Sequence, residues 1–271
     1  MENFDYLFYL GLYPDLRKAG IQSKEQAYRH YTKNGIHEGR IGHPDQMKEN
    51  MEEAQKQIYL ESRQYIPTKK IEEKLNILIR TSNRPTYFQK CIQSILEQNY
   101  ENYRIIICYD KEGSLAYLKE FENDSRITYF PVSVESKEKY RFNLYCNILM
   151  DRVEEGWIMF LDDDDMLCHD KVLSMINEHL NDKNSLYLWK FLRPDKVIYP
   201  KDVNNIRLGE IDTTSVCFHS IHKKKSRWPD KQCGDYAFYS GLIKNYSFTK
   251  IFMNSIFTKI INEDIIGNFG D

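Results

Sequence analysis

Long hydrophobic runs are missing from this chain of 271 residues. Its longest apolar runs, at residues 105–109 and 157–161, have five residues each, whereas a helix that crosses a bilayer needs about 18 or more. The first residues also lack a basic segment followed by an apolar stretch, which would mark a secretory signal. We therefore expect no transmembrane segment and a cytoplasmic location.

An excess of charge of one sign and closely paired cysteines are missing as well. The chain has 38 Lys and Arg against 40 Asp and Glu, a net charge of −2, so it has no overall basic field that would attract nucleic acid. Its six cysteines form no CxxC pair, which favours reduced, mostly buried thiols over a zinc site or disulfides. Hydrophobic residues make up 41% of the chain, enough for a globular core, and this excludes disorder as the main state.

The start of the chain has two short helical patterns. Residues 5–10 form the first, which we expect to stop at Gly11, and residues 23–34 form the second. Ser23 and Gln26 have the spacing of a capping box, in which each side chain bonds to the backbone N–H of the other residue. The second helix is therefore expected to begin at this point.

A longer helical pattern follows at residues 45–65 and is broken at Pro67, which biases its predecessor away from helical geometry. The pattern is Glu-rich and Lys-rich except for one apolar stripe, formed by Met47, Met51, Ala54 and Ile58. We predict a small all-α module with its linker at residues 1–67 and a second domain at residues 68–271.

In the second domain strands and helices alternate, which predicts an α/β fold with a mostly parallel central sheet. The expected strands are residues 75–79, 103–109, 126–132 and 157–161. The expected helices are one that opens at Pro85 and one at residues 142–153. Later segments are expected to be helical at residues 169–180 and extended at residues 185–192, 197–199 and 211–219. The last quarter of the chain gives no clear pattern.

Four consecutive aspartates, at positions 162–165, follow the apolar run 157–161. Ligands of open α/β sheets bind outside the carboxyl ends of strands, so chemistry is expected here. Adjacent carboxylates repel one another, and Mg²⁺ or Mn²⁺ would resolve the repulsion. An EF-hand would need Gly at position 167 and Glu at position 173, where Leu167 and Leu173 stand. A solvated acidic turn or a helix N-cap is the alternative.

The run from Leu161 to Asp165 resembles the DxD(D) signature of nucleotide-sugar-dependent glycosyltransferases of the GT-A fold, in particular the inverting family 2 type. The resemblance extends over roughly residues 73–245 and includes the order of elements around this run. Its other supporting residues are the strand end Arg80-Thr81-Ser82-Asn83-Arg84-Pro85, the helix residues Cys91, Ser94, Ile95 and Gln98, and Asp110 after the second strand.

The resemblance implies roles for individual residues. Asp164 would be the direct metal ligand, and Asp162 would bind the metal and in part the ribose. The other donor-binding residues that it implies are Thr81, Arg84, Asp110, Asn147 and Asp163. Asn143 and Asn147 lie one helical turn apart, before Gly156, as the family's Asn does before its Gly, although ordinary amides on the helix surface are an equal alternative.

A catalytic base is expected at Asp235. Gly234-Asp235-Tyr236 precedes a helical pattern and resembles the family's late (E/D)D motif, with Gly234 in place of its first acid. The alternative role of Asp235 is an ordinary helix N-cap.

Several other residues have two interpretations. His219 and His222 could bind the metal or be packed histidines, and the cluster Lys223, Lys224, Lys225 and Arg227 could bind an anion or be a solvated loop. Trp189 and Trp228 could stack on sugars or belong to the core. The first 65 residues resemble a small helical module found beside glycosyltransferase domains in some bacterial and large-virus proteins. Such a module could dock the catalytic domain, bind an acceptor or form a homo-oligomer.

Together with these features, the resemblance implies a metal-dependent inverting glycosyltransferase. Its donor would be a nucleotide diphosphate sugar, with a UDP-sugar expected, and its acceptor a hydroxyl group of a glycan, glycolipid or glycoprotein. Two alternatives are a sugar nucleotidyltransferase, although residues 81–85 lack the glycines of its usual loop, and a non-catalytic module that binds sugar nucleotides or proteins.

Overall fold

A computed structural model of the chain describes residues 4–66, 73–135, 139–245 and 249–263. Its strands are β1 (Leu75–Thr81), β2 (Tyr103–Tyr109), β3 (Ile127–Pro131), β4 (Trp157–Phe160), β5 (Asp165–Leu167), β6 (Ser185–Leu192), β7 (Ile198–Tyr199), β8 (Val216–His219) and β9 (Thr249–Ile260). Its α-helices are α1 (Tyr6–Leu12), α2 (Pro14–Lys18), α3 (Lys24–His30), α4 (Pro44–Gln64), α5 (Pro85–Leu96), α6 (Leu115–Leu118), α7 (Arg141–Asp151), α8 (Val172–His179) and α9 (Gly234–Asn245). The expected α/β class is confirmed.

One sheet contains these strands in the order β3-β2-β1-β4-β8-β6-β9-β5, with β7 paired to β6. The strands β3, β2, β1 and β4 are parallel, as the alternation of strands and helices predicts. Beyond β4 the sheet is mixed, because β8 runs antiparallel to both β4 and β6 while β9 is parallel to β6. The parallel half therefore brings the carboxyl ends of β1, β2 and β4 to one edge.

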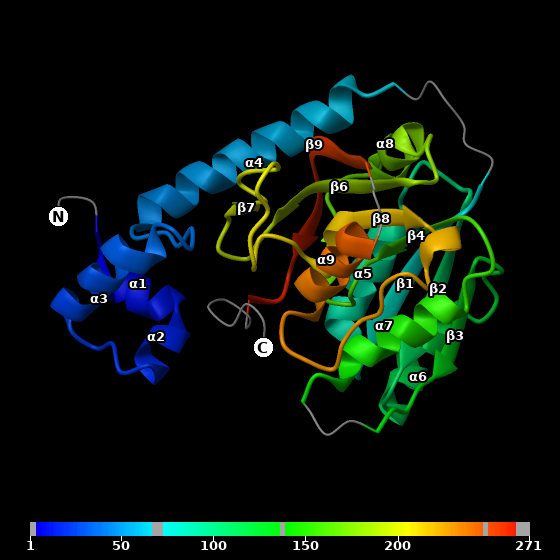
Figure 1. Cartoon of the computed structure of the whole chain (residues 1–271), viewed down its shortest axis with the longest axis horizontal. Coiled ribbons are helices and arrows are strands. Elements are labelled where there is room, and N and C mark those ends of the chain that lie inside the picture. Colours follow the sequence, from blue (N-terminus) through cyan, green and yellow to red (C-terminus); the bar gives the residue numbers. More distant parts are fainter. Residues whose placement is uncertain (1–3, 67–72, 136–138, 246–248, 264–271) are drawn as a thin grey trace.

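Helices cover both faces of the sheet (Figure 1). Side chains alternate between the faces of a strand, so Ile77 and Ile79 of β1 pack with α5, α6 and α8. Leu78 lies on the other face and packs with α7 and α9. The burial of both faces explains why the strands of the parallel half are almost continuously apolar.

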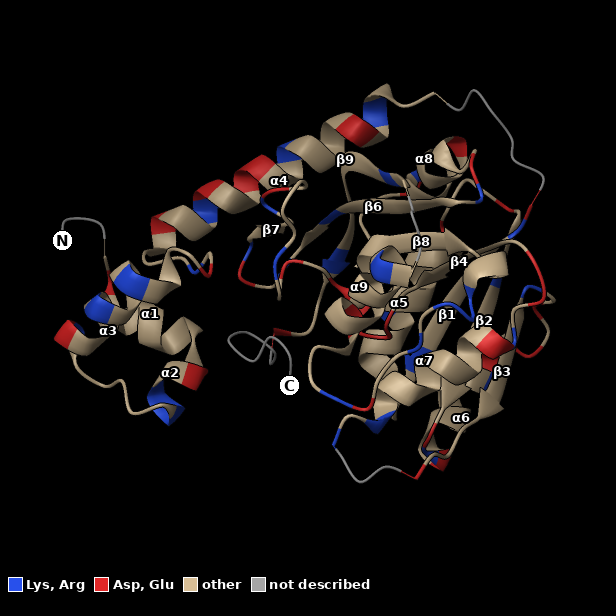
Figure 2. Cartoon of the chain, viewed as in Figure 1, with Lys and Arg blue, Asp and Glu red and all other residues tan. Residues whose placement is uncertain are grey.

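The N-terminal helices share a hydrophobic cluster with the sheet. Tyr9, Tyr13 and Leu16 pack with Phe191 and Tyr199 of the β6–β7 hairpin. Figure 1 shows α1, α2 and α3 at one end of the molecule and α4 running from them past β7 and β9. Charged residues of both signs are interspersed along α4 (Figure 2).

The capping box of Ser23 and Gln26 is confirmed at the start of α3. The expected stop at Gly11 is wrong, since α1 continues to Leu12. The stripe on α4 is only partly covered, because Ala54 is buried while Met51 is 40% exposed. The expected boundary at Pro67 lies outside the described residues.

The expected strand at 211–219 is half right. Only β8 is extended, because Asp212 and Ser215 form a capping box that turns residues 213–215 into a 3₁₀ helix. The strands β5 and β9 were not expected at all. In the described part of the chain, none of the helices has the length and apolar character that spanning a membrane requires.

Candidate active site

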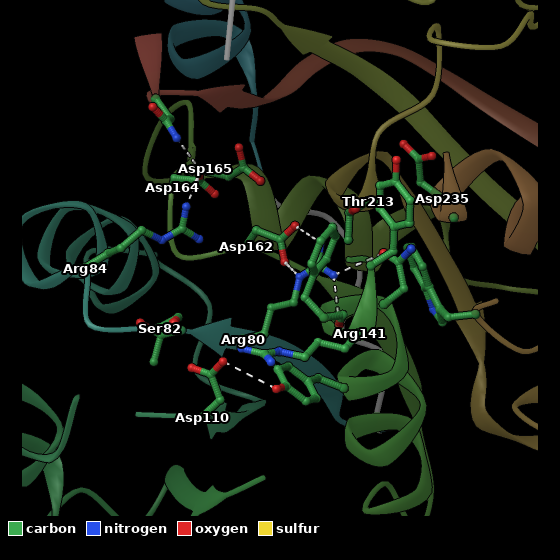
Figure 3. A pocket seen from close by; sticks show the side chains of 18 of the residues that line it. Arg80, Ser82, Arg84, Asp110, Arg141, Asp162, Asp164, Asp165, Thr213 and Asp235 are labelled. Atoms are coloured by element: carbon green, nitrogen blue, oxygen red, sulfur yellow. Dashed lines mark hydrogen bonds and ion pairs between the residues drawn. The ribbon is translucent and has the colours of Figure 1, made fainter. Parts of the chain in front are cut away.

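A cavity of about 760 Å³ opens at the carboxyl ends of β1, β2 and β4. Figure 3 shows charged side chains from several elements pointing into it. Its acidic lining residues are Asp110, Asp162, Asp164, Asp165, Asp212 and Asp235. Its basic lining residues are Arg80, Arg84, Lys111, Lys139 and Arg141. The sequence-predicted residues Thr81, Arg84, Asp110, Asp162, Asp164 and Asp235 therefore meet in one place.

Arg80 and Asp162 form a two-pronged ion pair inside the cavity. Nε of Arg80 donates to Oδ1 of Asp162 at 2.7 Å, and Nη2 donates to Oδ2 at 2.6 Å. The same guanidinium lies over the rings of Phe142 and Trp228, at 5.0 and 6.0 Å from their centroids. Both oxygens of Asp162 are thus engaged by a cation held rigidly in the wall.

Asp163 points into the interior, away from the cavity lining. It is fully buried and accepts hydrogen bonds from the Thr81 hydroxyl at 2.6 Å and from the Arg84 guanidinium. Burial raises the pKa of Asp163 to about 7, against the lowering effect of the Arg84 charge. In this arrangement Asp163 fixes Thr81 and Arg84 in place.

Asp164 follows Asp163 in the same loop, and one of its two carboxylate oxygens is available to a ligand. Its Oδ2 accepts from Nη1 of Arg84 at 2.7 Å and from Nδ2 of Asn262 at 2.9 Å. Its Oδ1 accepts no hydrogen bond from any residue that the structure describes. Asp164 can therefore offer an oxygen to a ligand or cation without breaking its existing bonds.

Asp110 follows β2 and has an unsatisfied acceptor. The Tyr145 hydroxyl donates to its Oδ2 at 3.4 Å, while its Oδ1 is buried and lacks a hydrogen-bond partner among the described residues. A buried carboxylate oxygen without a donor is costly. The site is therefore suited to a ligand that brings an N–H or O–H group to Asp110.

Asp235 is the second residue of α9, so it lies inside the helix rather than at the N-cap position. Its Oδ1 accepts from the Tyr236 N–H at 2.7 Å. Burial raises the pKa of Asp235 to about 6, whereas the Tyr236 N–H and the charge of Arg80 lower it. The carboxylate is therefore ionised at neutral pH, and its pKa is close enough to neutral pH for it to accept a proton.

Two more acidic residues line the cavity between these groups. Asp165 opens β5 and is 3% exposed, and burial together with the charge of Asp212 holds its pKa well above the usual range. Asp212 accepts from the Thr214 N–H and hydroxyl, both at 2.9 Å, and burial raises its pKa to about 7.

The two asparagines of α7 both form hydrogen bonds to backbone groups, but only one of them lines the cavity. Asn147 accepts from the Trp228 N–H at 2.9 Å and donates to the Trp228 carbonyl at 3.0 Å, and it is not among the lining residues. Asn143 does line the cavity, and it donates to the carbonyls of Pro229 and Lys231 at 3.3 and 2.8 Å. Together they anchor the segment that leads to Asp235.

The other candidates from the sequence lie elsewhere. His219 pairs with Trp157 at the start of β4, whereas Asp162 follows the end of that strand, so His219 is at the opposite edge of the sheet, where it contacts Glu73. His222 contacts Asn184. In the basic cluster, Lys223 contacts the Val153 carbonyl and Arg227 pairs with Asp151.

The two tryptophans separate. Trp189 is fully buried in the core. Trp228 lines the cavity and stacks on Phe238, with ring centroids 4.9 Å apart.

The carboxylate oxygens of the site fit a hard divalent cation that takes most of its other ligands from a bound substrate and from water. Among the described residues no group of three or more His, Cys, Asp or Glu side chains is arranged around a metal position. Mg²⁺ commonly takes one or two protein carboxylates and fills its other positions with water and phosphate oxygens. Asp164, with its open Oδ1, satisfies this mode directly, whereas Asp162 is already neutralised by Arg80.

Sequence reasoning missed Arg80, Tyr145, Asp212 and Asn262 as site residues. Arg80 could have been recognised from the sequence, since it is the one charged residue of β1. Asp212 lies in the segment mistaken for a strand, and Asn262 in the quarter without a clear pattern. Nothing in their own sequence spacing marks Tyr145 or Asn262.

A family model described as Glycosyl transferase family 2 matches residues 76–260. Among curated proteins, Protein CgeD of Bacillus subtilis (strain 168) is 23% identical over 111 residues, which cover 39% of this chain and 26% of that protein. Glycosyltransferase GlyA of Streptococcus pneumoniae serotype 4 is 28% identical over 105 residues, which cover 38% of this chain and 14% of that protein. The matched segments thus span about a quarter or less of these relatives.

Solved structures show the same fold. TarS 1-349 of S. aureus superposes with a TM-score of 0.58 at 14% identity, over 69% of this chain and 60% of that chain, and a related crystal contains UDP-GlcNAc. The mannosyltransferase PcManGT of Pyrobaculum calidifontis, in complex with GDP-Man and Mn²⁺, gives a TM-score of 0.53 at 12% identity, over 72% of this chain and 58% of that chain. The expected GT-A fold is confirmed by this likeness.

Proposed function

Because the chain belongs to glycosyl transferase family 2, we propose that its cavity transfers a sugar from a nucleotide diphosphate sugar to a hydroxyl acceptor, with inversion at the anomeric carbon. The observation that carries the proposal is the meeting of Asp110, Asp164 and Asp235 in one cavity at the carboxyl ends of parallel strands. Asp110 would supply a hydrogen-bond acceptor for the nucleotide, and Asp164 an open oxygen on the diphosphate side. Asp235 would accept the proton.

The nucleotide would bind at the Asp110 end. The open, buried Oδ1 of Asp110 can accept from a base N–H or a ribose hydroxyl. Uridine fits this proposal because its N3–H is a single donor next to two acceptor oxygens. Arg141 and Lys111 line the same cavity and can bond the diphosphate, since their charges are not used in ion pairs with described residues.

The diphosphate would lie toward Asp164. Asp164, through its open Oδ1, is the residue that would hold Mn²⁺ or Mg²⁺, with Asp162 beside it. When bound, such an ion offsets the charge that grows on the leaving diphosphate. Arg84, which is 36% exposed and paired with Asp163 and Asp164, places a further positive charge at this end.

Asp235 would take the proton of the attacking acceptor hydroxyl. An inverting displacement needs the base on the side of the sugar opposite to the leaving group. Asp235 comes from α9, whereas Asp164 follows β4, and Figure 3 shows the two on different sides of the pocket. The pKa of Asp235, about 6, suits proton transfer at neutral pH.

The acceptor and the role of the N-terminal module are part of the same proposal. The acceptor would be a hydroxyl of a glycan, glycolipid or glycoprotein that enters beside Asp235. Residues 1–67 would form a module that supports the sheet at β6 and β7, where Tyr13 and Tyr199 already join the two parts, and that is available for contacts between copies of the chain.

A nucleotide-sugar panel with Mn²⁺ tests the proposal. Release of nucleoside diphosphate that is stimulated by an acceptor would support glycosyl transfer. Release of pyrophosphate would indicate a nucleotidyltransferase instead, and binding without turnover would indicate a non-catalytic module.

A further inference from the structure

Asp165 is a buried acid whose carboxyl lines the cavity and has no hydrogen-bond partner among the described residues. It is 3% exposed and lines the cavity. Its backbone pairs with Ile260 in the β5–β9 ladder, but its carboxyl makes no hydrogen bond to any described residue. A buried carboxyl without donors is unfavourable unless a ligand supplies them.

Asp212 is a second acid that lines the cavity. Its Oδ1 is bonded to Thr214, while its Oδ2 receives no hydrogen bond from the residues described. Both side chains line the cavity, and the charge of Asp212 adds to burial in raising the pKa of Asp165. They come from separate elements, β5 and the 3₁₀ turn before β8.

The two acids come from the two sides of the interval between the leaving group and the base. Asp165 directly follows Asp164, and Asp212 directly precedes Thr213, which lines the cavity together with Asp235. In Figure 3, Asp164 and Asp165 occupy one side of the pocket while Thr213 and Asp235 occupy the other. In the proposed reaction, the sugar to be transferred must span this interval, because its anomeric carbon lies between the diphosphate and the attacking hydroxyl.

We propose that Asp165 and Asp212 bind hydroxyl groups of the donor's sugar and thereby select which nucleotide sugar is used. This inference rests on the proposed glycosyl transfer. Sugar hydroxyls are neutral donors that can satisfy buried carboxyl oxygens without adding charge. A site built to bond a hydroxyl discriminates strongly against a sugar that lacks it or presents it in another orientation, since the buried acids are then left unpaired.

The test compares Asp165→Asn and Asp212→Asn with the wild type in two measurements. The first is the dissociation constant of UDP and of GDP in the presence of Mn²⁺. The second is kcat/KM for release of nucleoside diphosphate from UDP-glucose, its C4 epimer UDP-galactose, UDP-GlcNAc and GDP-mannose. We expect nucleotide affinity within about twofold of wild type, a 10- to 100-fold loss of kcat/KM for the preferred donor, and a smaller ratio between the epimers.

Asp110→Asn is the matched control, because it changes an acid of the nucleotide end of the same cavity. It should weaken UDP and the UDP-sugars together. Retained nucleotide binding in the Asp165 and Asp212 variants shows that they are folded. The inference is overturned if these variants weaken UDP binding in the presence of Mn²⁺ as much as donor turnover, or leave the ratio between the epimers unchanged. A wild type that binds nucleotide but turns over none of the donors overturns the proposed function itself.

Discussion

Single arginines set the charge balance of the cavity. Arg80 neutralises Asp162 through two short hydrogen bonds, and its guanidinium lies over the rings of Phe142 and Trp228. Arg84 joins Asp163 to Asp164. The four consecutive aspartates therefore differ in their surroundings. Asp162 is ion-paired and Asp163 is internal. Among the described residues, Oδ1 of Asp164 and the carboxyl of Asp165 have no hydrogen-bond donor.

We predict that Arg80→Lys will lower kcat/KM for donor turnover by about 10- to 100-fold. Lysine keeps the charge but cannot reproduce the planar two-pronged contact with Asp162. Arg126→Lys is the matched control, because Arg126 makes a similar pair with Asp124 on the surface, where such pairs contribute little. Steady-state kinetics of both variants checks this, and equal activity of the two variants would mean that the Arg80 geometry does not matter.

Asp235→Asn should reduce acceptor transfer by at least about 10²-fold, because it removes the proton acceptor, with little change in nucleotide affinity. In the wild type, the logarithm of the transfer rate should fall as pH drops through about 6, since protonation of Asp235 at its raised pKa removes the base form. A transfer rate measured from pH 5 to 8 that stays flat would remove Asp235 from the mechanism.

At the scale of elements, helix α7 holds the segment before α9 in place through hydrogen bonds. Asn143 and Asn147, one turn apart, bond to the backbone of residues 228–231. These hydrogen bonds hold Trp228 against Arg80. The bonded segment continues directly into α9, the helix that carries Asp235. The helix α7 therefore positions both the acid-binding arginine and the base.

Asn147→Ala should lower the free energy of unfolding by about 2 kcal/mol, because the backbone N–H and carbonyl of Trp228 both lose their partner. It should also slow transfer more than it weakens nucleotide binding. Gln93→Ala, which removes an exposed contact on α5, is the control and should stay within about 0.5 kcal/mol of wild type. Denaturant unfolding checks both values, and equal stabilities would show that the α7 contact is not structural.

Elements with strong local patterns could be predicted from the sequence. The apolar runs of β1, β2 and β4 and the capping box of α3 depend on neighbouring residues alone. The strand β5 could not be predicted, because it exists only through its pairing with β9, about ninety positions later in the register Asp165↔Ile260. The acid run was found as a motif, but the different roles of its four members depend on Arg80, Arg84 and Asn262, which only the folded chain brings to it.

At the scale of the whole molecule, the N-terminal helices and the sheet share one cluster. Tyr13 is fully buried, and its hydroxyl donates to Asp195 at 3.3 Å, which is in turn paired with Arg193. Tyr199 donates to the Glu38 carbonyl at 2.9 Å. The N-terminal helices and the sheet are thus joined by buried polar and apolar contacts, which favours coupled unfolding.

Leu16→Ala tests that coupling, because Leu16 is buried in the shared cluster. The substitution should cost about 2 to 5 kcal/mol of stability, and thermal unfolding should remain a single transition that moves as a whole. Calorimetry that resolves two transitions, with only one shifted, would instead show that the module folds independently.

The most direct test of the account is nucleoside diphosphate release from a nucleotide-sugar panel by the wild type and by Asp164→Asn, each with Mn²⁺ and with EDTA. The account predicts that at least one donor is turned over by the wild type with Mn²⁺, that an acceptor stimulates the release, and that Asp164→Asn or EDTA abolishes it while the fold persists. Full activity in EDTA or in Asp164→Asn, or release of pyrophosphate, would contradict it.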